Sequence, residues 1–274
     1  MNSKIEELKQ LRDNINLVIK GDPQILAEAP TIIITNHNCL KDIFYLPMGL
    51  ITEDKIISLI SSRLIYKKDI ERQKIVDKYL YSMPIEAHGG NIYARLCLDT
   101  ATDLLVDGNH LNIFPEGAYI NDKNNVYKGR TGAVRILFSA KEKGSQPNIL
   151  PVAIEINSSD NNLDNYNFHQ SDQVTITILN PIDYKDTYYN YQNSSTFEEK
   201  NTQLHKIMET GMQSIANSLN RKYIDSYIEL FPKGNVMFAN GEKIATSLAS
   251  NNLYLSRYKN EIETRSKSLR KILK

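Results

Sequence analysis

The sequence predicts an α/β fold: a central sheet, mostly parallel or mixed, with helices on both faces and a helical tail at the C-terminus. Two observations support this class. Short runs of apolar, often β-branched residues alternate along the chain with longer segments whose apolar residues recur at helical spacing. The chain also has 274 residues, of which 41% are hydrophobic, so it can bury a sizeable core. We therefore expect one large domain with short additions at its ends.

The first elements set the pattern. Residues 3–20 carry apolar side chains at helical spacing and end at the turn-forming residues 21–23, which predicts an amphipathic helix. The run 31–35 reads Thr-Ile-Ile-Ile-Thr, which is short and β-branched enough for a buried strand. A helix over 41–51 is expected to follow it.

The remaining elements repeat this alternation. Residues 91–107 place apolar side chains at helical spacing and end at Gly108, which favours a helix stop. Residues 174–178 alternate apolar and polar side chains, as a half-exposed strand does. The other strands expected are 56–60, 83–88, 111–114 and 149–154. The other helices expected are 66–80, 132–143 and 197–219.

Segments without such periodicity divide the chain. Residues 157–173 are crowded with Asn, Asp and Ser, which is typical of a solvated loop. The chain after residue 222 lacks the alternation of the core. We therefore expect an N-terminal amphipathic helix over 1–24, a main domain over 25–222 and a basic C-terminal appendage over 223–274.

The composition argues against several classes of protein. Lys and Arg number 33 against 32 Asp and Glu, and a net charge of +1 argues against a nucleic-acid binder. Two cysteines are too few for a disulfide framework and suit a reducing compartment. No apolar run approaches the roughly 18–20 residues of a membrane span, and the N-terminus lacks the apolar stretch of a signal peptide. These observations predict a soluble, cytoplasmic protein.

The segment 36–42, Asn-His-Asn-Cys-Leu-Lys-Asp, contains a histidine and an aspartate that could work together. On one continuous helix His37 and Asp42 would lie about 140° apart. They can meet if His37 sits in the turn after the strand and Asp42 in the first turn of the next helix. A carboxylate on one imidazole nitrogen leaves the other able to take a proton, so such a pair can act as a general base. The spacing alone also fits a histidine that is merely hydrogen-bonded near a helix start.

The segment 114–117, Phe-Pro-Glu-Gly, directly follows a predicted strand. Proline ends the strand and glycine permits a close backbone approach, which would hold Glu116 at the carboxyl edge of the sheet. Ligands of open α/β sheets bind at that edge. An ordinary tight turn with an exposed acid is the alternative interpretation.

In their order and spacing, these two segments resemble the first and third motifs of the 1-acylglycerol-3-phosphate acyltransferase (PlsC-like) family. Residues 128–133 resemble the basic-x-Gly-Ala turn that follows the third motif, and residues 149–152 resemble the fourth motif. Residues 174–183 resemble the closing strand and its Pro-Ile turn. The resemblance covers residues 25–222 and implies a glycerolipid acyltransferase-like fold.

The resemblance implies an activity. The expected reaction moves a fatty acyl group from acyl-CoA or acyl carrier protein to the hydroxyl of a glycerol-phosphate or lysophospholipid-type acceptor. His37 would be the general base and Asp42 the residue that orients it, without a covalent acyl-enzyme. No metal and no cofactor besides the acyl donor are expected.

The resemblance also implies a donor site. In the family, the proline of the fourth motif lines this site, which would be Pro151 here, together with Asn36 and Cys39 of the first motif. Cys39 stands where a serine is common in the family. A catalytic thiol at this position is the alternative interpretation, since thiol reactivity depends on stabilisation of the thiolate.

Two motifs depart from the family pattern where the acceptor's phosphate is bound. The strand of the second motif usually ends with an arginine, but Ala87 or His88 stands there. Arg95 is either a displaced substitute or a surface residue. The third motif continues with Ala-Tyr-Ile over 118–120, where the family usually has Thr-Arg-Ser. Neither alanine nor tyrosine can grip phosphate with a planar fork as arginine does.

Some capacity to bind an anion is nevertheless expected. Arg63 and Arg130 occupy positions where the family often has lysine. By resemblance, the acceptor-binding residues expected are Glu116, Gly117, Arg130, Arg63, His88 and Arg95.

Three functions therefore remain open. The first is acyl transfer in phospholipid or glycerolipid synthesis. The second is the same chemistry on a non-phosphate acceptor, such as an amine or hydroxyl of a specialised metabolite, which the missing arginines favour. The third is a non-catalytic protein that binds an acyl chain or its carrier. The His37–Asp42 pair together with Glu116 argues against the third function, since only chemistry requires them together.

The charge distribution suggests a partner surface. Residues 253–274 carry seven Lys or Arg and two Glu, a net charge of +5, so residues 1–252 sum to −4. A basic tail can lie on the anionic inner face of a membrane or contact an acidic acyl carrier protein. A solvated terminal helix is an equally good interpretation.

Overall fold

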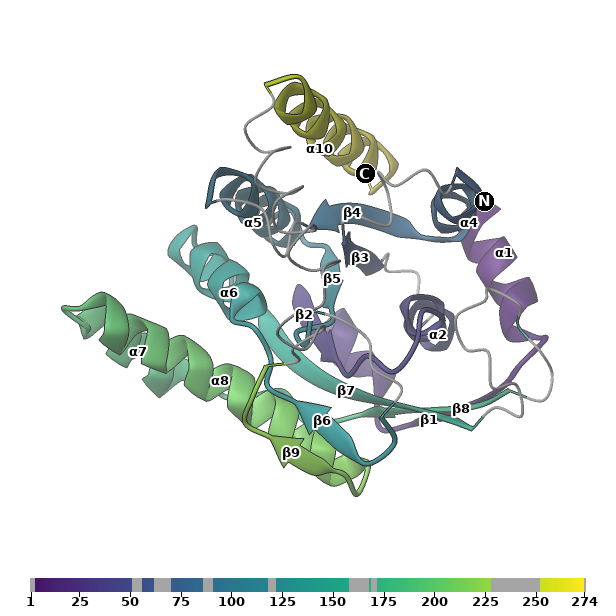
Figure 1. Ribbon diagram of the computed structural model, residues 1–274, viewed down its shortest axis with the longest axis horizontal. Helices are drawn as coiled ribbons and strands as arrows, with labels where there is room; N and C mark the ends of the chain where they lie inside the picture. Colours follow the sequence, from purple (N-terminus) through teal and green to yellow (C-terminus); the bar gives the residue numbers. More distant parts are fainter. Residues whose placement is uncertain are drawn as a thin grey trace, which may run out of the picture.

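A seven-stranded sheet runs through the middle of the protein (Figure 1). The structure is a computed structural model, which describes residues 3–50, 56–61, 70–85, 91–117, 122–157, 168, 172–227 and 252–273. In spatial order the strands are β1 (Asn16–Lys20), β8 (Gln173–Ile178), β7 (Asn148–Asn157), β2 (Thr31–Thr35), β5 (His110–Ile113), β3 (Ile56–Ser61) and β4 (Tyr81–Ile85). All neighbours are parallel except β7 and β8, which are antiparallel. The predicted mixed, mostly parallel sheet is confirmed.

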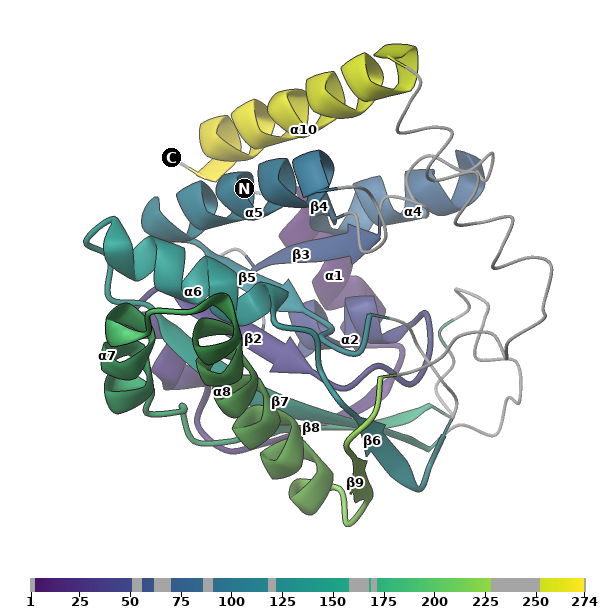
Figure 2. The same cartoon turned by 60° about the vertical axis from the view of Figure 1, so that its left-hand side comes forward.

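Helices cover both faces of the sheet, as predicted (Figures 1 and 2). One face carries α1 (Ser3–Arg12), α2 (Asp42–Gly49) and α4 (Ile70–Tyr79). The other carries α5 (Asn91–Val106), α6 (Gly132–Glu142) and α8 (Phe197–Ser218), against which α7 (Lys185–Asn193) packs. Alternation along β2 explains the two layers: Ile33 packs with α2, whereas Ile32 and Ile34 pack with α6 and α8.

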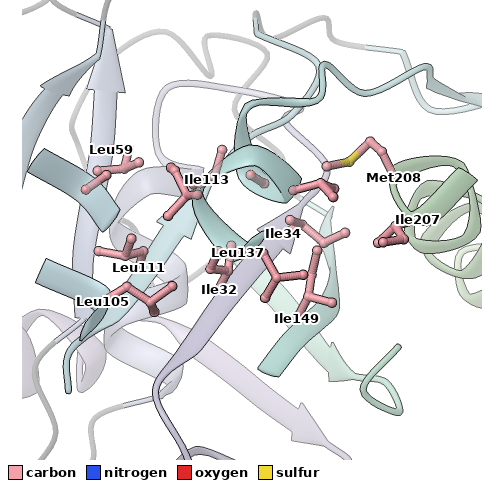
Figure 3. Packing of buried hydrophobic residues seen from close by; sticks show 14 of the residues in the cluster. Ile32, Ile34, Leu59, Leu105, Leu111, Ile113, Leu137, Ile149, Ile207 and Met208 are labelled. Carbon is pink, nitrogen blue, oxygen red and sulfur yellow. The ribbon is translucent and has the colours of Figure 1, made fainter. Parts of the chain in front are cut away.

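The central strand β2 is held closely by α8. Figure 3 shows Ile34 on the side of the sheet that faces Ile207 and Met208 of α8. A Cβ atom on Gly211 of α8 would lie 2.4 Å from Cδ1 of Ile34, so the helix approaches the strand only because this residue is glycine. This packing gives the carboxyl end of β2 a fixed position.

The C-terminal tail forms the helix α10 (Asn252–Leu273), which packs on α5 and β4 (Figure 2). Ile262 and Leu269 are buried in this contact. Arg265 pairs with Asp77 at 2.7 Å, and Arg270 with Asp107 at 2.9 Å. The predicted helical tail is confirmed, and two of its cations are engaged by the body of the protein. Among the described helices, none is both long and apolar enough to cross a membrane.

The helix predicted over 3–20 is wrong in its second half. The helix ends at Arg12, and residues 16–20 form the edge strand β1, parallel to β8. The run Leu17-Val18-Ile19 favours a strand, although its apolar spacing also fits a helix. Backbone hydrogen bonds to β8 stabilise the strand here.

Other short elements were not expected from the sequence. They are the 3-10 helix η1 (Pro23–Ala27), the helix α7, and the parallel strands β6 (Asn125–Tyr127) and β9 (Lys222–Ile224), which pair with each other. The polar loop expected over 157–173 is contradicted at its end, where Asp172 is fully buried. Most of that loop lies outside the described residues, as do residues 66–69 and 86–88 of two predicted elements.

The buried Asp172 fixes the start of α2. Its carboxylate lies 3.3 Å from Nζ of Lys41, and neither side chain has exposed surface. The hydroxyl of Tyr45 donates a hydrogen bond to the same carboxylate at 3.1 Å. Because Lys41 directly precedes Asp42, this ion pair ties the first turn of α2 to the beginning of β8.

Replacing Asp172 with Ala should strongly destabilise the fold, because the ammonium group of Lys41 would remain buried without its counter-charge. We expect the free energy of unfolding to fall by about 3–5 kcal/mol. Urea unfolding followed by circular dichroism would measure this. Asp99→Ala is the matched control, because it breaks the exposed pair with Arg95 and should leave the midpoint nearly unchanged. Equal midpoints for the two variants would contradict this view of the buried pair.

Candidate active site

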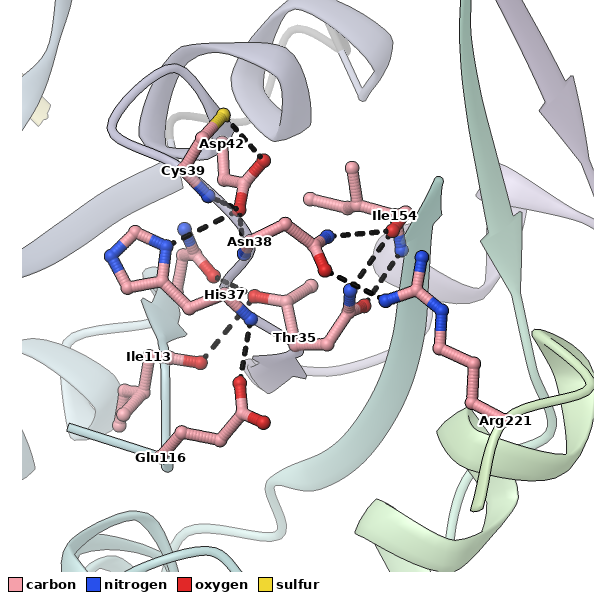
Figure 4. Close-up of polar contacts among 11 residues, drawn as sticks. Thr35, His37, Asn38, Cys39, Asp42, Ile113, Glu116, Ile154 and Arg221 are labelled. Carbon is pink, nitrogen blue, oxygen red and sulfur yellow. Dashed lines mark hydrogen bonds and ion pairs between the residues drawn. The ribbon is translucent and has the colours of Figure 1, made fainter. Parts of the chain in front are cut away.

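The loop between β2 and α2 forms the centre of the candidate site (Figure 4). β2 ends at Thr35 and α2 begins at Asp42, so His37 lies in the loop and Asp42 in the first helical turn, as the sequence predicts. Nδ1 of His37 lies 3.2 Å from Oδ2 of Asp42. Since β2 stands between β5 and β7, the pair occupies the middle of the sheet's carboxyl edge.

The Asp42 carboxylate collects donors from its own loop. Oδ2 also accepts hydrogen bonds from the backbone N–H groups of Asn38 and Cys39, the latter at 3.0 Å. Oδ1 accepts one from Sγ of Cys39 at 3.5 Å. Because the Asp42 side chain has no exposed surface, these donors replace water around its charge. The carboxylate is therefore held in one position, with the loop wrapped around it.

The imidazole of His37 is oriented by two contacts. It stacks on the ring of Phe114, with centroids 4.2 Å apart, and its Nδ1 faces Asp42. When Nδ1–H donates to the carboxylate, Nε2 is the nitrogen that can accept a proton. The side chain keeps 12% of its surface exposed, so a substrate can reach it. The arrangement can act as a general base.

The residues just before His37 are tied to both neighbouring strands. Nδ2 of Asn36 donates to the carbonyl of Ile154 in β7 at 2.9 Å, and Oδ1 accepts from the N–H of Ile154 at 2.8 Å. Oγ1 of Thr35 donates to Oδ1 of Asn112 in β5 at 3.1 Å. These bonds fix the start of the loop. The side-chain amide of Asn36, which was expected at the donor site, is hydrogen-bonded to the backbone of β7 instead.

Glu116 binds the backbone of the same loop. Its buried carboxylate accepts hydrogen bonds from the N–H of His37 at 2.7 Å and from the N–H of Tyr127 at 2.9 Å. Burial raises the pKa of Glu116 to about 7, against the opposing effect of the two N–H donors. The carboxylate thus joins the His37 loop to β6.

A pocket of about 460 Å³ lies next to the stacked rings, and Phe114 is part of its wall. Most of its apolar side chains come from β3, β4, β5 and α5: Leu59, Ile85, Ala94, Leu98 and Ile113. Its polar side chains come mainly from α6, α8 and the segments next to them: Arg130, Thr131, Arg135, Asn201, His205 and Tyr227. The volume and the mixed lining suit a small ligand with an apolar part and a polar part.

Gly117 and Arg130 depend on each other in the wall of this pocket. Gly117 has φ +76°, and a Cβ atom there would lie 2.8 Å from Nε of Arg130. Glycine therefore provides both the backbone conformation and the room for the guanidinium. The buried Nε of Arg130 has no hydrogen-bond partner among the described residues, and the guanidinium lies over the ring of Tyr227 at 5.4 Å. Arg130 thus offers a positive charge to the pocket.

Three basic side chains near the site were not expected from the sequence. Arg135 of α6 and His205 of α8 line the pocket, and Arg221 reaches the loop between β2 and α2 through Asn38. Burial lowers the pKa of His205, and the nearby Lys128 and Arg135 lower it further. Each of these residues lies in or after a helix, where an exposed charged side chain is the common case, so only the tertiary structure reveals them.

Two further predicted site residues, Arg95 and Pro151, lie apart from the pocket. Arg95 is on the exposed side of α5, 3.9 Å from Asp99, and does not line the pocket. Pro151 is buried within β7, opposite Ile34 of β2. Arg63 and His88 lie outside the described residues.

Cys39 lies beneath the site. Its side chain is buried, and burial raises the pKa of the thiol, as does the charge of Asp42 beside it. The group therefore stays protonated, which disfavours its action as a nucleophile.

Comparisons with known proteins bear on this arrangement. A family model described as Acyltransferase matches residues 16–155, just over half of the chain, including His37, Asp42 and Glu116. Among solved structures, the 1-acyl-sn-glycerophosphate (LPA) acyltransferase PlsC from Thermotoga maritima is similar. It shares 18% identity over 77% of this chain and 79% of its own, with a TM-score of 0.47. No curated protein matches the sequence significantly.

The pKa of Glu116 predicts a pH-dependent stability. Because its folded pKa of about 7 exceeds the ordinary 4.5, the folded state binds more protons than the unfolded state between these values. The free energy of unfolding should therefore fall as pH rises from about 4.5 to about 7, by on the order of 3 kcal/mol. Glu116→Gln should lack this component in urea titrations at several pH values. Glu142→Gln, on the exposed end of α6, should keep it. Parallel pH profiles for Glu116→Gln and the wild type would contradict the assignment.

Proposed function

Since the chain belongs to the acyltransferase family, we propose that it transfers a fatty acyl group from acyl-CoA or acyl carrier protein to the hydroxyl of a glycerol-phosphate or lysophospholipid-type acceptor. The observation that carries this proposal is the His37–Asp42 pair, 3.2 Å apart at the carboxyl edge of the sheet. The family match supports acyl transfer, and the pocket beside His37 supports an acceptor with an apolar and a polar part.

The proposed reaction has two steps. Nε2 of His37 takes the proton of the acceptor hydroxyl as its oxygen attacks the thioester carbonyl carbon, and Asp42 stabilises the imidazolium that forms. The tetrahedral oxyanion then collapses, the carbon–sulfur bond breaks, and the imidazolium returns the proton to the leaving thiolate. The products are an ester and a free thiol, with no acyl-enzyme. The protonated, buried Cys39 agrees with this direct transfer.

Two arginines support an anionic acceptor. Arg130 and Arg135 both line the pocket, and Nε of Arg130 has no hydrogen-bond partner among the described residues. A phosphate in the pocket would supply the missing acceptor oxygens. Acceptor binding by Glu116 is indirect in this proposal, because its carboxylate holds the backbone of His37.

The absence of arginine at 87–88 and 118–120 favours the second candidate, the same chemistry on a non-phosphate amine or hydroxyl acceptor. The two candidates differ in what Arg130 would do. It would bind the acceptor's charge in the first and have no such ligand in the second.

In this proposal, an acyl carrier protein that delivers the acyl group binds the exposed side of α10. Lys267 and Lys271 are exposed there, while Arg265 and Arg270 are engaged by the body of the protein. These lysines are the place where an acidic acyl carrier protein, or the inner face of a membrane, would make contact.

Replacing His37 with Ala tests the proposed chemistry. Loss of the general base should lower kcat about a hundredfold to ten-thousandfold, while the thermal unfolding curve stays close to that of the wild type. The release of free thiol from acyl-CoA, measured with and without 1-acylglycerol 3-phosphate, reports the transfer. Unchanged acceptor-dependent release in the variant would contradict the catalytic role and favour a non-catalytic acyl-binding protein.

Replacing Arg130 with Gln separates the two acceptor classes. If the acceptor carries phosphate, KM for 1-acylglycerol 3-phosphate should rise about tenfold to a hundredfold, since a charge-assisted hydrogen bond is lost. KM for a phosphate-free 1-acylglycerol should stay the same. Arg95→Gln, which removes an exposed arginine away from the pocket, is the matched control. Wild-type kinetics of Arg130→Gln with the phosphate acceptor would favour the non-phosphate class.

A further inference from the structure

Arg221 reaches the catalytic loop from a part of the chain beyond the family match at 16–155. α8 ends at Ser218, and Asn220 adopts the left-handed conformation with φ 53°. The N–H of Arg221 then donates to the carbonyl of Ala216 at 2.9 Å, which closes the helix end. This turn directs the chain back toward the sheet, and Figure 4 shows the Arg221 side chain extending to the loop that carries His37.

The contacts of Arg221 place it against the loop that carries His37. Nη1 donates to Oδ1 of Asn38 at 2.7 Å and to the carbonyl of Asp122 at 3.4 Å. Asn38 directly follows His37 in the sequence, and its Nδ2 donates to the carbonyl of Ile154 in β7 at 3.1 Å. Arg221 therefore lies on the β7 side of the loop, whereas Phe114 and the pocket lie on its β5 side.

Arg221 has carboxylates in its surroundings but none in direct contact. Burial lowers its pKa, and the charges of Glu155, Glu116, Asp122 and Asp42 oppose that shift. No carboxylate of the described residues lies within ion-pair distance of its half-buried guanidinium, which bonds only to a side-chain amide and a backbone carbonyl. Both bonds use Nη1. Nε and Nη2, which form one edge of the guanidinium, have no hydrogen bond to the described residues. A half-buried cation with an unused two-donor edge suits a bidentate anion such as phosphate.

We propose that Arg221 binds a phosphate group of a substrate beside His37, in place of the arginines that the second and third motifs of this chain lack. The inference rests on the proposed acyl transfer and adds a binding residue from the C-terminal end of α8. The acceptor carries such a phosphate when it is a glycerol-phosphate type lipid. The pantetheine arm of the donor carries one in both acyl-CoA and acyl carrier protein.

Steady-state kinetics of Arg221→Gln, Arg221→Lys and the control Arg95→Gln test the proposal. Each enzyme is offered 1-acylglycerol 3-phosphate or 1-acylglycerol as acceptor, and acyl-CoA or the phosphate-free acyl-pantetheine as donor. Arg221→Gln should raise KM for the phosphate-bearing form of one substrate about tenfold to a hundredfold, and leave KM for its phosphate-free form unchanged. Arg221→Lys, which keeps the charge without the fork, should fall between. The substrate whose KM responds identifies the source of the phosphate.

The same experiment separates binding from a merely structural contact. If Arg221 only tethers Asn38, Arg221→Gln should lower kcat for all four substrates alike, with every KM unchanged, and Asn38→Ala should reproduce that pattern. Either this result or wild-type kinetics in Arg221→Gln would overturn the proposal. Turnover by the wild type and its loss in His37→Ala report separately on the proposed function, so the two failures are distinguishable.

Discussion

The buried carboxylate of Asp42 is the charge around which the loop between β2 and α2 is organised. An ionised group without exposed surface is tolerated only where donors replace its water shell. Here the donors are the imidazole of His37 and the N–H groups of Asn38 and Cys39, all from the loop that precedes it. The loop cannot relax without leaving this charge unsatisfied. The position of the imidazole is therefore a consequence of the electrostatics of Asp42.

The surrounding structure restrains the same loop from three sides. Asn36 fastens its start to β7, Glu116 holds the N–H of His37 from the end of β5, and the Lys41–Asp172 pair anchors the first turn of α2. A reacting group that is held in place before the substrate arrives needs little reorganisation during the reaction. The price is a set of buried polar groups, among them a Glu116 whose pKa lies near neutrality.

The sequence predicts the parts of this arrangement that depend on local pattern. The β-branched run at 31–35 and the His37–Asp42 spacing lead to the observed strand, loop and helix start, because each is set by neighbouring residues. Residues 16–20 are predicted wrongly. Their apolar spacing also fits a helix, but hydrogen bonding with β8 makes them a strand. Arg135, His205 and Arg221 are not predictable, because only tertiary packing brings α6 and the end of α8 to the sheet edge.

The replacement of Asp42 by Asn tests the central claim most directly. An asparagine oxygen can still accept hydrogen bonds from the N–H groups of Asn38 and Cys39, while the negative charge beside the imidazole of His37 is lost. Turnover of acyl-CoA with 1-acylglycerol 3-phosphate, measured beside thermal unfolding, should show kcat lowered by about three to four orders of magnitude with an intact fold. A correctly folded Asp42→Asn variant with wild-type kcat would contradict the account.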